Sequence, residues 1–223
     1  MIHFHSFFAH SSNRTPAERR SYINQPISYT PTTDYLSYGR DYWDNPKIPI
    51  GYNGYTYDGR YKQAAAAIKQ YLNLSVPSNI LEIGCSRGHL LVEFDELGFN
   101  ISGVDVSTYA LETCVPSLSN RLTYLDPSTT PLTGTYDVII CKDVLPHIAT
   151  EKLPFLFLNI NSVLASNGVL VAEIKTVESN TSRNLSKRFD PTQQSLFPRS
   201  LWVSFLTQYI QGHDCILGSS ELF

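Results

Sequence analysis

The chain of 223 residues has few cysteines, few charged side chains and no long apolar run. Its four cysteines share no CxxC spacing, which argues against a zinc knuckle or a dithiol redox site; they are Cys85, Cys114, Cys141 and Cys215. We therefore expect no metal, and we expect the reduced thiols of a cytoplasmic protein. No segment reaches the roughly 18 apolar residues that a membrane span needs, so none is expected.

The charge is small and unevenly distributed. The net charge is −3, but residues 1–79 carry +3 and residues 80–223 carry −6. This balance gives no general attraction to nucleic acid. Hydrophobic residues make up 42% of the chain, which is enough for the packed core of one domain.

Residues 1–60 are expected to form an arm or lid ahead of a domain at 61–223. They show no sustained period of 2 or 3.6 and contain five prolines, and residues 1–61 hold nine of the 14 tyrosines. Such a segment becomes ordered only by packing on something else.

From residue 61 onward, short apolar runs alternate with helix-length segments, which indicates a mostly parallel sheet with helices on both faces. Strands are expected at 80–83, 101–104, 122–125, 136–141, 169–174 and 215–217. Helices are expected at 61–72, 88–97, 107 to about 116, 151–164 and 199–210, with a loop or short cover over 175–198. We expect an α/β, doubly wound sheet of six or seven strands, which binds its ligand beyond the carboxyl ends of the strands.

The most informative segment is a glycine loop between a buried strand and a helix. Gly84 permits a tight turn, and Gly88 permits close packing at the helix start. Their GxxxG spacing differs from the GxGxxG of dinucleotide-binding proteins, and no GK[ST] phosphate loop is present. Glu82 would repel a pyrophosphate and suits a cationic ligand.

Acidic residues also end the next two strands. Asp105 lies 21 residues after Gly84, where a carboxylate can accept hydrogen bonds from both hydroxyls of a ribose. Asp126 could meet an adenine amino group, although Asp126-Pro127 is also an ordinary turn signal.

Four segments together resemble the class I S-adenosylmethionine-dependent methyltransferases in order and spacing. They span residues 82–88, 103–107, 136–140 and 164–170. The resemblance implies a Rossmann-like fold, S-adenosylmethionine as methyl donor and S-adenosylhomocysteine as product. Residues 54–61 further resemble a segment found in a subgroup associated with sugar, glycan or small-molecule methylation.

The resemblance also implies which residues form the donor site. Those expected at the methionine part are Glu82, Gly84, Cys85 and Gly88, with Tyr57 and Arg60 closing over it. Those expected at the nucleoside are Asp105 for the ribose, Val106 beside the adenine and Asp126 for the adenine amino group. Cys141 would offer a backbone carbonyl to the amino group of the donor.

Lys142, Asp143 and His147 follow the strand at 136–141 and would face the acceptor. An alcohol acceptor must lose its proton as the new bond forms, and a base with a pKa near neutrality suits that task. His147 is the first candidate and Asp143 the second. On a helix, residues four apart share a face, so Asp143 could orient the imidazole.

We therefore expect O-methylation of a small-molecule or glycan hydroxyl, with no nucleic-acid partner. Two alternatives stay open. An RNA or protein methyltransferase is disfavoured by the acidic balance of residues 80–223, and a non-catalytic module would bind the donor only as a ligand. The chain could also be one domain of a longer protein, or a homo-oligomer.

Overall fold

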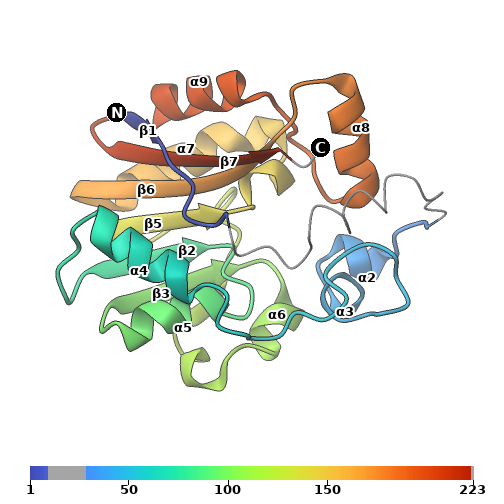
Figure 1. Ribbon diagram of the computed structural model, residues 1–223, viewed down its shortest axis with the longest axis horizontal. Helices are drawn as coiled ribbons and strands as arrows, with labels where there is room; N and C mark the ends of the chain where they lie inside the picture. The colour runs from blue at the N-terminus through green and yellow to red at the C-terminus, as the bar shows by residue number, and fades with distance from the viewer. Residues whose placement is uncertain (10–28, 222–223) are drawn as a thin grey trace.

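The computed structural model describes residues 1–9 and 29–221, and within them seven strands form one sheet (Figure 1). The strands are β1 (Ile2–Phe4), β2 (Asn79–Ile83), β3 (Asn100–Asp105), β4 (Leu122–Tyr124), β5 (Tyr136–Lys142), β6 (Leu164–Thr176) and β7 (Asp214–Glu221). Their order across the sheet is β1-β7-β6-β5-β2-β3-β4, and every neighbouring pair is parallel. The expected α/β class is confirmed.

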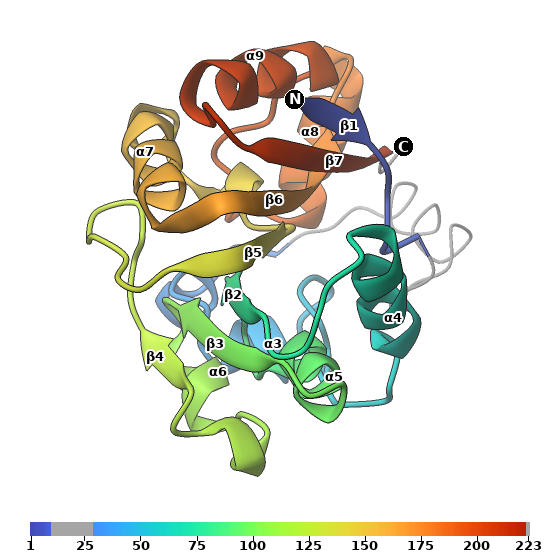
Figure 2. The ribbon, with the colours of Figure 1, turned by 90° about the vertical axis from the view of Figure 1, so that its left-hand side faces the viewer.

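Helices cover both faces of the sheet, with α4 and α5 on one face and α7 and α9 on the other (Figure 2). The α-helices are α2 (Thr33–Leu36), α3 (Arg40–Trp43), α4 (Lys62–Tyr71), α5 (His89–Glu96), α6 (Thr108–Glu112), α7 (Leu153–Val163), α8 (Asn180–Phe189) and α9 (Arg199–Tyr209). Short 3-10 helices are η1 (Pro116–Leu118), η2 (Leu145–His147) and η3 (Thr150–Lys152). None of these helices is long and apolar enough to cross a membrane.

The central strand β5 shows why its sequence is a continuous apolar run. Val138 and Ile140 pack in the core under α4 and α5, whereas Ile139 and Cys141 pack in the core under α7 and α9. All four side chains are fully buried. Successive side chains of a strand point to opposite faces, so a strand covered on both sides needs apolar residues at every position.

Three expectations about regular structure were wrong or incomplete. Ile2–Phe4, within the arm, forms β1 because it pairs with β7 at the edge of the sheet, and three residues are too few to show a period. The last strand is longer than residues 215–217. Residues 180–189, expected as loop or cover, form α8, a polar surface helix started by a capping box between Ser179 and Ser182.

The arm from residue 29 onward packs beyond the carboxyl ends of the strands, where Figure 1 shows α2 and α3. Its aromatic rings contact one another, with centroids 5.0 Å apart for Tyr42 and Trp43 and 4.9 Å apart for Trp43 and Tyr52. Tyr35, Tyr42 and Trp43 are buried. The rings of this part of the arm thus pack on one another; residues 10–28 of the expected arm lie outside the described residues.

Candidate active site

The glycine loop between β2 and α5 lies at the carboxyl edge of the sheet. Gly84 and Gly88 have φ of +72° and +79°, and Ser86 between them has φ of +51°. A Cβ on Gly84 would lie 2.2 Å from Val144 Cγ2, in the segment after β5. Glycine is therefore required at this position both by its conformation and by the close approach of the neighbouring segment.

Asp105 connects this loop to the start of α6. Its Oδ2 accepts a hydrogen bond from the Ser86 backbone N–H at 2.7 Å, and its Oδ1 accepts one from the Ser107 N–H at 2.8 Å. The Ser107 hydroxyl in turn caps α6 through Ala110, as the sequence predicts. Burial raises the pKa of the Asp105 carboxyl, while the backbone N–H groups oppose that shift.

Three polar side-chain atoms of the loop region are buried and without a hydrogen-bond partner among the described residues: Glu82 Oε2, Ser86 Oγ and Arg87 Nε. Burial raises the pKa of the Glu82 carboxyl well above its usual range, although the Lys142 ammonium opposes this. A buried carboxyl oxygen and a buried hydroxyl without partners can be satisfied by a polar ligand. A ligand carrying an ammonium group fits them, so the residues present suit the cationic donor predicted from the sequence.

Four other residues were predicted to bind the donor: Asp126, Cys85, Cys141 and Val106. Asp126 Oδ1 accepts hydrogen bonds from Ser128 N and Oγ at 2.9 and 2.6 Å, so the carboxylate organises the turn after β4. The thiols of Cys85 and Cys141 are buried, and burial raises the pKa of both. Val106 follows Asp105 at the end of β3. Their contacts to the donor stay predictions.

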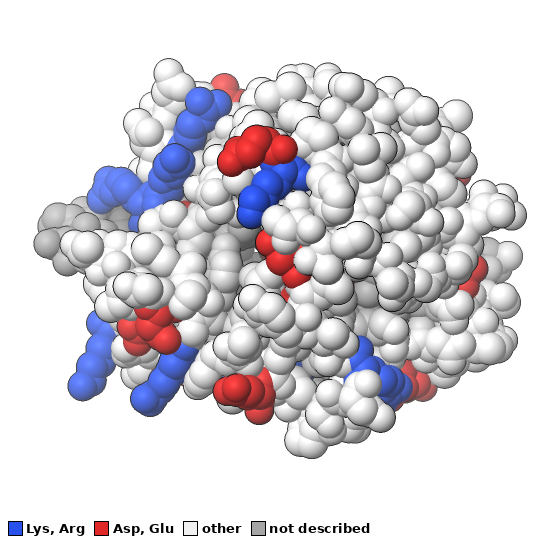
Figure 3. Space-filling model, turned by 180° about the vertical axis from the view of Figure 1, so that it is seen from behind, with Lys and Arg blue, Asp and Glu red and all other residues white. Residues whose placement is uncertain are grey.

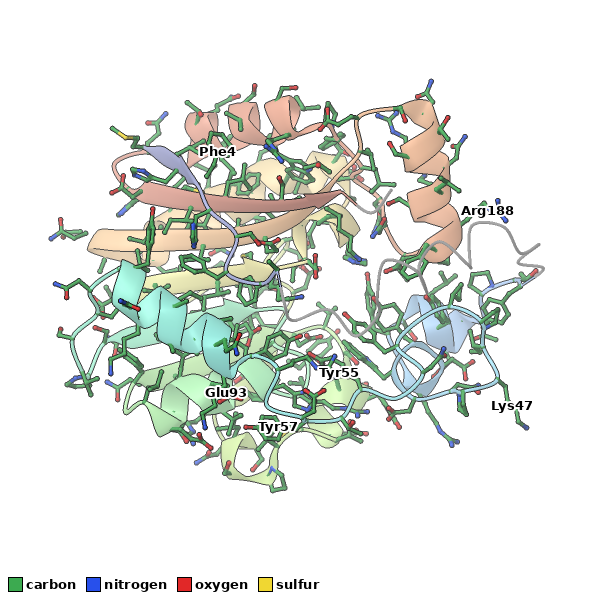
Figure 4. All side chains as sticks on the ribbon, in the orientation of Figure 1. Phe4, Lys47, Tyr55, Tyr57, Glu93 and Arg188 are labelled. Carbon is green, nitrogen blue, oxygen red and sulfur yellow. The ribbon has the colours of Figure 1, made fainter. Side chains whose placement is uncertain are left out.

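Tyr57 and Arg60, expected to close over the donor, make other contacts. The Tyr57 hydroxyl donates to Glu93 Oε1 of α5 at 3.0 Å, and the two side chains lie side by side in Figure 4. Arg60 forms an ion pair with Asp58, Nη2 to Oδ2 2.6 Å. The ring stacked on the start of α5 is instead the buried Tyr55.

Tyr55 lies against His89 with ring centroids 4.6 Å apart, and its hydroxyl bonds to the Tyr61 hydroxyl at 3.0 Å. Burial lowers the pKa of His89 to about 4, with the Arg87 and Arg60 charges acting in the same direction. The imidazole is therefore neutral at pH 7 and stacks as an uncharged ring.

Arg87 joins the glycine loop to the arm, a role that its position inside the loop motif did not reveal. Its guanidinium forms an ion pair with Asp44 and donates to the Tyr55 carbonyl at 2.6 Å. The Tyr109 hydroxyl, from α6, also donates to Asp44 at 2.9 Å. The arm is thus bonded to the glycine loop and to α6.

The segment after β5 does not form the helix that would pair Asp143 with His147. Asp143 has φ of +57°, and η2 begins two residues later. Its Oδ2 lies 2.6 Å from Lys142 Nζ. Burial alone would raise the pKa of the Asp143 carboxyl, but the Lys142 charge lowers it to about 2. The expectation that Asp143 orients the imidazole is therefore wrong, because the carboxylate is committed to Lys142.

His147 instead contacts a loop that sequence reasoning did not connect to it. Its Nδ1 lies 2.8 Å from Thr192 Oγ1, and its Nε2 lies 3.8 Å from Asp190 Oδ2. Burial lowers the pKa of His147, and the Asp190 charge partly opposes this. The His147 N–H donates to the Val144 carbonyl at 2.9 Å, and Val144 packs on Gly84. Val144 therefore connects the backbone of His147 to the glycine loop.

Helix α8, at the end of the molecule where the arm also lies, carries basic side chains. The helix α8 has three basic and no acidic residues, and Arg183, Lys187 and Arg188 are exposed. Figure 3, which views the molecule from behind, shows Lys and Arg side chains gathered at the end where α8 and the arm lie.

The chain matches the family model described as "Methyltransferase domain" over residues 57–208. It therefore belongs to this family of S-adenosylmethionine-dependent methyltransferases, and the predicted class and methyl donor are confirmed. The match begins inside the arm and ends within α9, so it spans both the glycine loop and the segment that carries His147.

Curated relatives share part of this region. The "Ubiquinone biosynthesis O-methyltransferase, mitochondrial" of Schizosaccharomyces pombe is 36% identical over 100 residues, which are 41% of this chain and 36% of the relative. The "Ubiquinone biosynthesis O-methyltransferase" of Rickettsia typhi is 28% identical over 109 residues, which are 47% of this chain and 44% of the relative. The chain spans less than half the length of these relatives.

Solved structures agree with the fold. A SAM-dependent methyltransferase from Archaeoglobus fulgidus superposes with a TM-score of 0.55 at 19% identity, covering 70% of this chain and 69% of that one. The YcgJ protein from Bacillus subtilis gives 0.55 at 16% identity, covering 65% and 66%. At these identities the likeness shows the shared fold.

Proposed function

We propose that this methyltransferase acts on a hydroxyl oxygen of a small molecule and that His147 is the general base. The observation that carries the proposal is an imidazole that is only 13% exposed, with its pKa lowered, at the same sheet edge as the glycine loop. The names of the curated relatives, which are O-methyltransferases, support the same kind of acceptor.

The donor half of the site needs only to bind and orient. S-adenosylmethionine, when bound, supplies a methyl group on a sulfonium sulfur that leaves as a neutral thioether. In the proposal Glu82 receives the ammonium group of the donor, and Asp105 accepts the ribose hydroxyls while its backbone bonds keep it in place. Positioning is the main contribution, because the methyl group is already activated.

The acceptor half must remove a proton. As the hydroxyl oxygen bonds to the methyl carbon and the carbon–sulfur bond breaks, the hydroxyl proton passes to His147. A histidine whose pKa lies below its ordinary value is neutral at pH 7 and can accept that proton. Asp143 is a weak base with its pKa of about 2, so the proposal gives it no proton transfer and assigns it to holding Lys142.

The acceptor itself is proposed at the level of a phenolic or sugar hydroxyl. The basic rim on α8 favours acceptors with an anionic group, because exposed cations raise the local concentration of anions. A screen should therefore pair catechol with 3,4-dihydroxybenzoate, and methyl glucoside with glucose 6-phosphate. Faster transfer to the anionic member of each pair is the expected result.

The test separates donor binding from transfer. S-adenosylhomocysteine binding is measured by calorimetry, and transfer of a radiolabelled methyl group to the four acceptors is measured for the wild type and for His147→Gln. The variant should bind the donor product within about threefold and lose on the order of 100-fold in transfer. His3→Gln, at an exposed ion pair on β1, is the matched control and should do neither. Full transfer by His147→Gln, or methylation of amines alone, would refute the proposal.

A further inference from the structure

The loop that follows α8 is hydrogen-bonded to the segment that carries His147. The Gln194 and Ser195 N–H groups both donate to the Pro146 carbonyl, at 2.8 and 2.9 Å. The Gln194 amide donates to the His147 carbonyl at 2.8 Å, and the Ser195 hydroxyl donates to the Ile148 carbonyl at 2.7 Å. Two chain segments 45 residues apart are thus held in fixed register around the imidazole.

Within this frame, the Asp190 carboxylate acts only as an acceptor. Its Oδ1 accepts from the Thr192 N–H at 3.1 Å and from the Thr192 hydroxyl at 2.5 Å, and its Oδ2 accepts from the Tyr42 hydroxyl at 3.2 Å. The side chain is 11% exposed. An ionised carboxylate has no proton to donate, so every one of these bonds has its hydrogen on the partner.

This arrangement determines which nitrogen of His147 carries the proton. A threonine hydroxyl has one hydrogen, and that of Thr192 is used in the bond to Asp190. At the contact with His147 the hydroxyl oxygen can therefore only accept, so the hydrogen lies on Nδ1. The neutral imidazole then has its lone pair on Nε2.

We propose that Thr192 and Asp190 are positioning residues that hold the His147 proton on Nδ1 and so make Nε2 the atom that receives the acceptor proton. The inference rests on the proposed role of His147 as base. Once Nε2 is protonated, the imidazolium lies 3.8 Å from Asp190 Oδ2, which stabilises its charge. Asp190 thus serves the neutral form through Thr192 and the charged form directly.

The other charged and titratable groups around the imidazole come from three elements. Asp143 follows β5 and favours the charged form of the ring, whereas Lys175 on β6 disfavours it. The Tyr38 ring, from the arm, lies edge-on to the imidazole with centroids 6.0 Å apart. Burial raises the pKa of Tyr38 to about 12, and a side-chain hydrogen bond with Thr192 opposes that rise. The neutral phenol can donate to the second lone pair of the Thr192 oxygen, which leaves the Thr192 hydrogen on Asp190. Removing Asp190 therefore leaves one carboxylate and one ammonium acting on the ring.

The first test needs no acceptor. Long-range ¹H–¹⁵N correlation spectra of the histidine-labelled protein distinguish the Nδ1–H and Nε2–H tautomers, and His147→Gln identifies the resonances of His147. The wild type should show the Nδ1–H form at pH 8. Thr192→Val has the same shape but no hydroxyl and should lose this preference, whereas Thr192→Ser should keep it.

The second test is the rate with whichever of catechol, 3,4-dihydroxybenzoate, methyl glucoside and glucose 6-phosphate reacts in the screen. Thr192→Val should lower kcat by about tenfold or more with an unchanged KM for S-adenosylmethionine, and Thr192→Ser should stay within about twofold. Asp190→Asn should move the ascending limb of the kcat/KM profile to lower pH, because a charge that favours the imidazolium is removed.

The outcomes separate this inference from the proposed function. An Nε2–H tautomer in the wild type, or a Thr192→Val variant with unchanged tautomer and kcat, overturns the inference even if hydroxyl methylation is observed. The Nδ1–H tautomer with its loss in Thr192→Val supports the positioning role, even if no hydroxyl acceptor reacts and the proposed function fails. Thermal melting of each variant shows that the fold is retained.

Discussion

The two halves of the site are built at very different ranges along the chain. On the donor side, Asp105 is bonded to residues 19 and 2 positions away, within one β-loop-α-β unit. On the acceptor side, His147 is bonded to a residue 45 positions away, and Asp190 is bonded to Tyr42, 148 positions away. The donor side is therefore a local structure, and the acceptor side depends on the whole fold.

This difference suggests that the two sides should respond independently to mutation, apart from the contacts that join them. The Arg87–Asp44 ion pair and the Ser107 hydroxyl bind the arm, which carries Tyr42 and Tyr38 to the acceptor side. Val144 also packs on Gly84 and accepts from the His147 N–H. Changes on the donor side that leave these contacts in place should leave His147 undisturbed, and changes at them should reach both sides.

The largest effect is expected from Asp105→Asn. In the proposed site Asp105 accepts the ribose hydroxyls, and the change removes that charge and weakens the two backbone hydrogen bonds, so affinity for S-adenosylhomocysteine should fall on the order of 100-fold. Calorimetry measures this loss, and the His147 resonances should stay in place. Asp95→Asn is the control and should bind normally, since it breaks only the ion pair between Asp95 on α5 and Arg121, whose side chains are 33% and 32% exposed. A shifted His147 spectrum in Asp105→Asn would break the division into two halves.

The same division explains what could be predicted from the sequence. The glycine loop, Asp105 and the Ser107 cap are encoded by residue types at short, fixed spacings, and each lies where the pattern predicts. The contacts of His147 could not be predicted, because nothing in residues 143–147 indicates that the chain returns at residue 190 to supply Asp190 and Thr192. Helix α8 was missed because only two of its residues, Leu185 and Phe189, are apolar, and two positions four apart are too few to indicate a helix among polar residues.

The second largest effect is expected from Asp44→Asn. The Arg87 and Asp44 side chains are 8% and 26% exposed, and removing one partner leaves a guanidinium without its carboxylate. Loss of such a pair should lower the free energy of unfolding by about 3 kcal/mol. If the arm instead detaches locally, the free energy of unfolding should fall by less than this. Urea unfolding measures the first outcome, and faster hydrogen exchange over residues 38–55 measures the second. Asp95→Asn should cost about 1 kcal/mol or less; equal effects would show that the arm is not specially anchored.

A pH-dependent effect is expected from Glu173, on β6, whose carboxylate accepts from the Ser6 hydroxyl at 3.0 Å. Burial and the nearby Asp143 charge raise its pKa to about 7. The folded state therefore keeps the Glu173 proton up to a higher pH than the unfolded chain does. The stabilisation from this proton binding is present below the unfolded pKa and is lost as the pH rises through 7. Glu173→Gln should therefore raise the free energy of unfolding by about 2 kcal/mol more at pH 8 than at pH 5. Equal changes at the two pH values would show that the carboxyl does not titrate in this range.

The smallest effect tests how tightly the donor side is packed. Gly88 and Gly212 share a φ of +79°, but a Cβ on Gly88 would lie 2.8 Å from Leu118 Cδ1, whereas a Cβ on Gly212 would meet nothing within 4 Å. Both alanine variants carry the cost of a left-handed residue, about 1 kcal/mol. Gly88→Ala should cost about 1 kcal/mol more, because the fully buried Leu118 has little room to move. Urea unfolding measures the difference between the two variants. Equal losses in the free energy of unfolding would mean that glycine is needed at position 88 only for its positive φ.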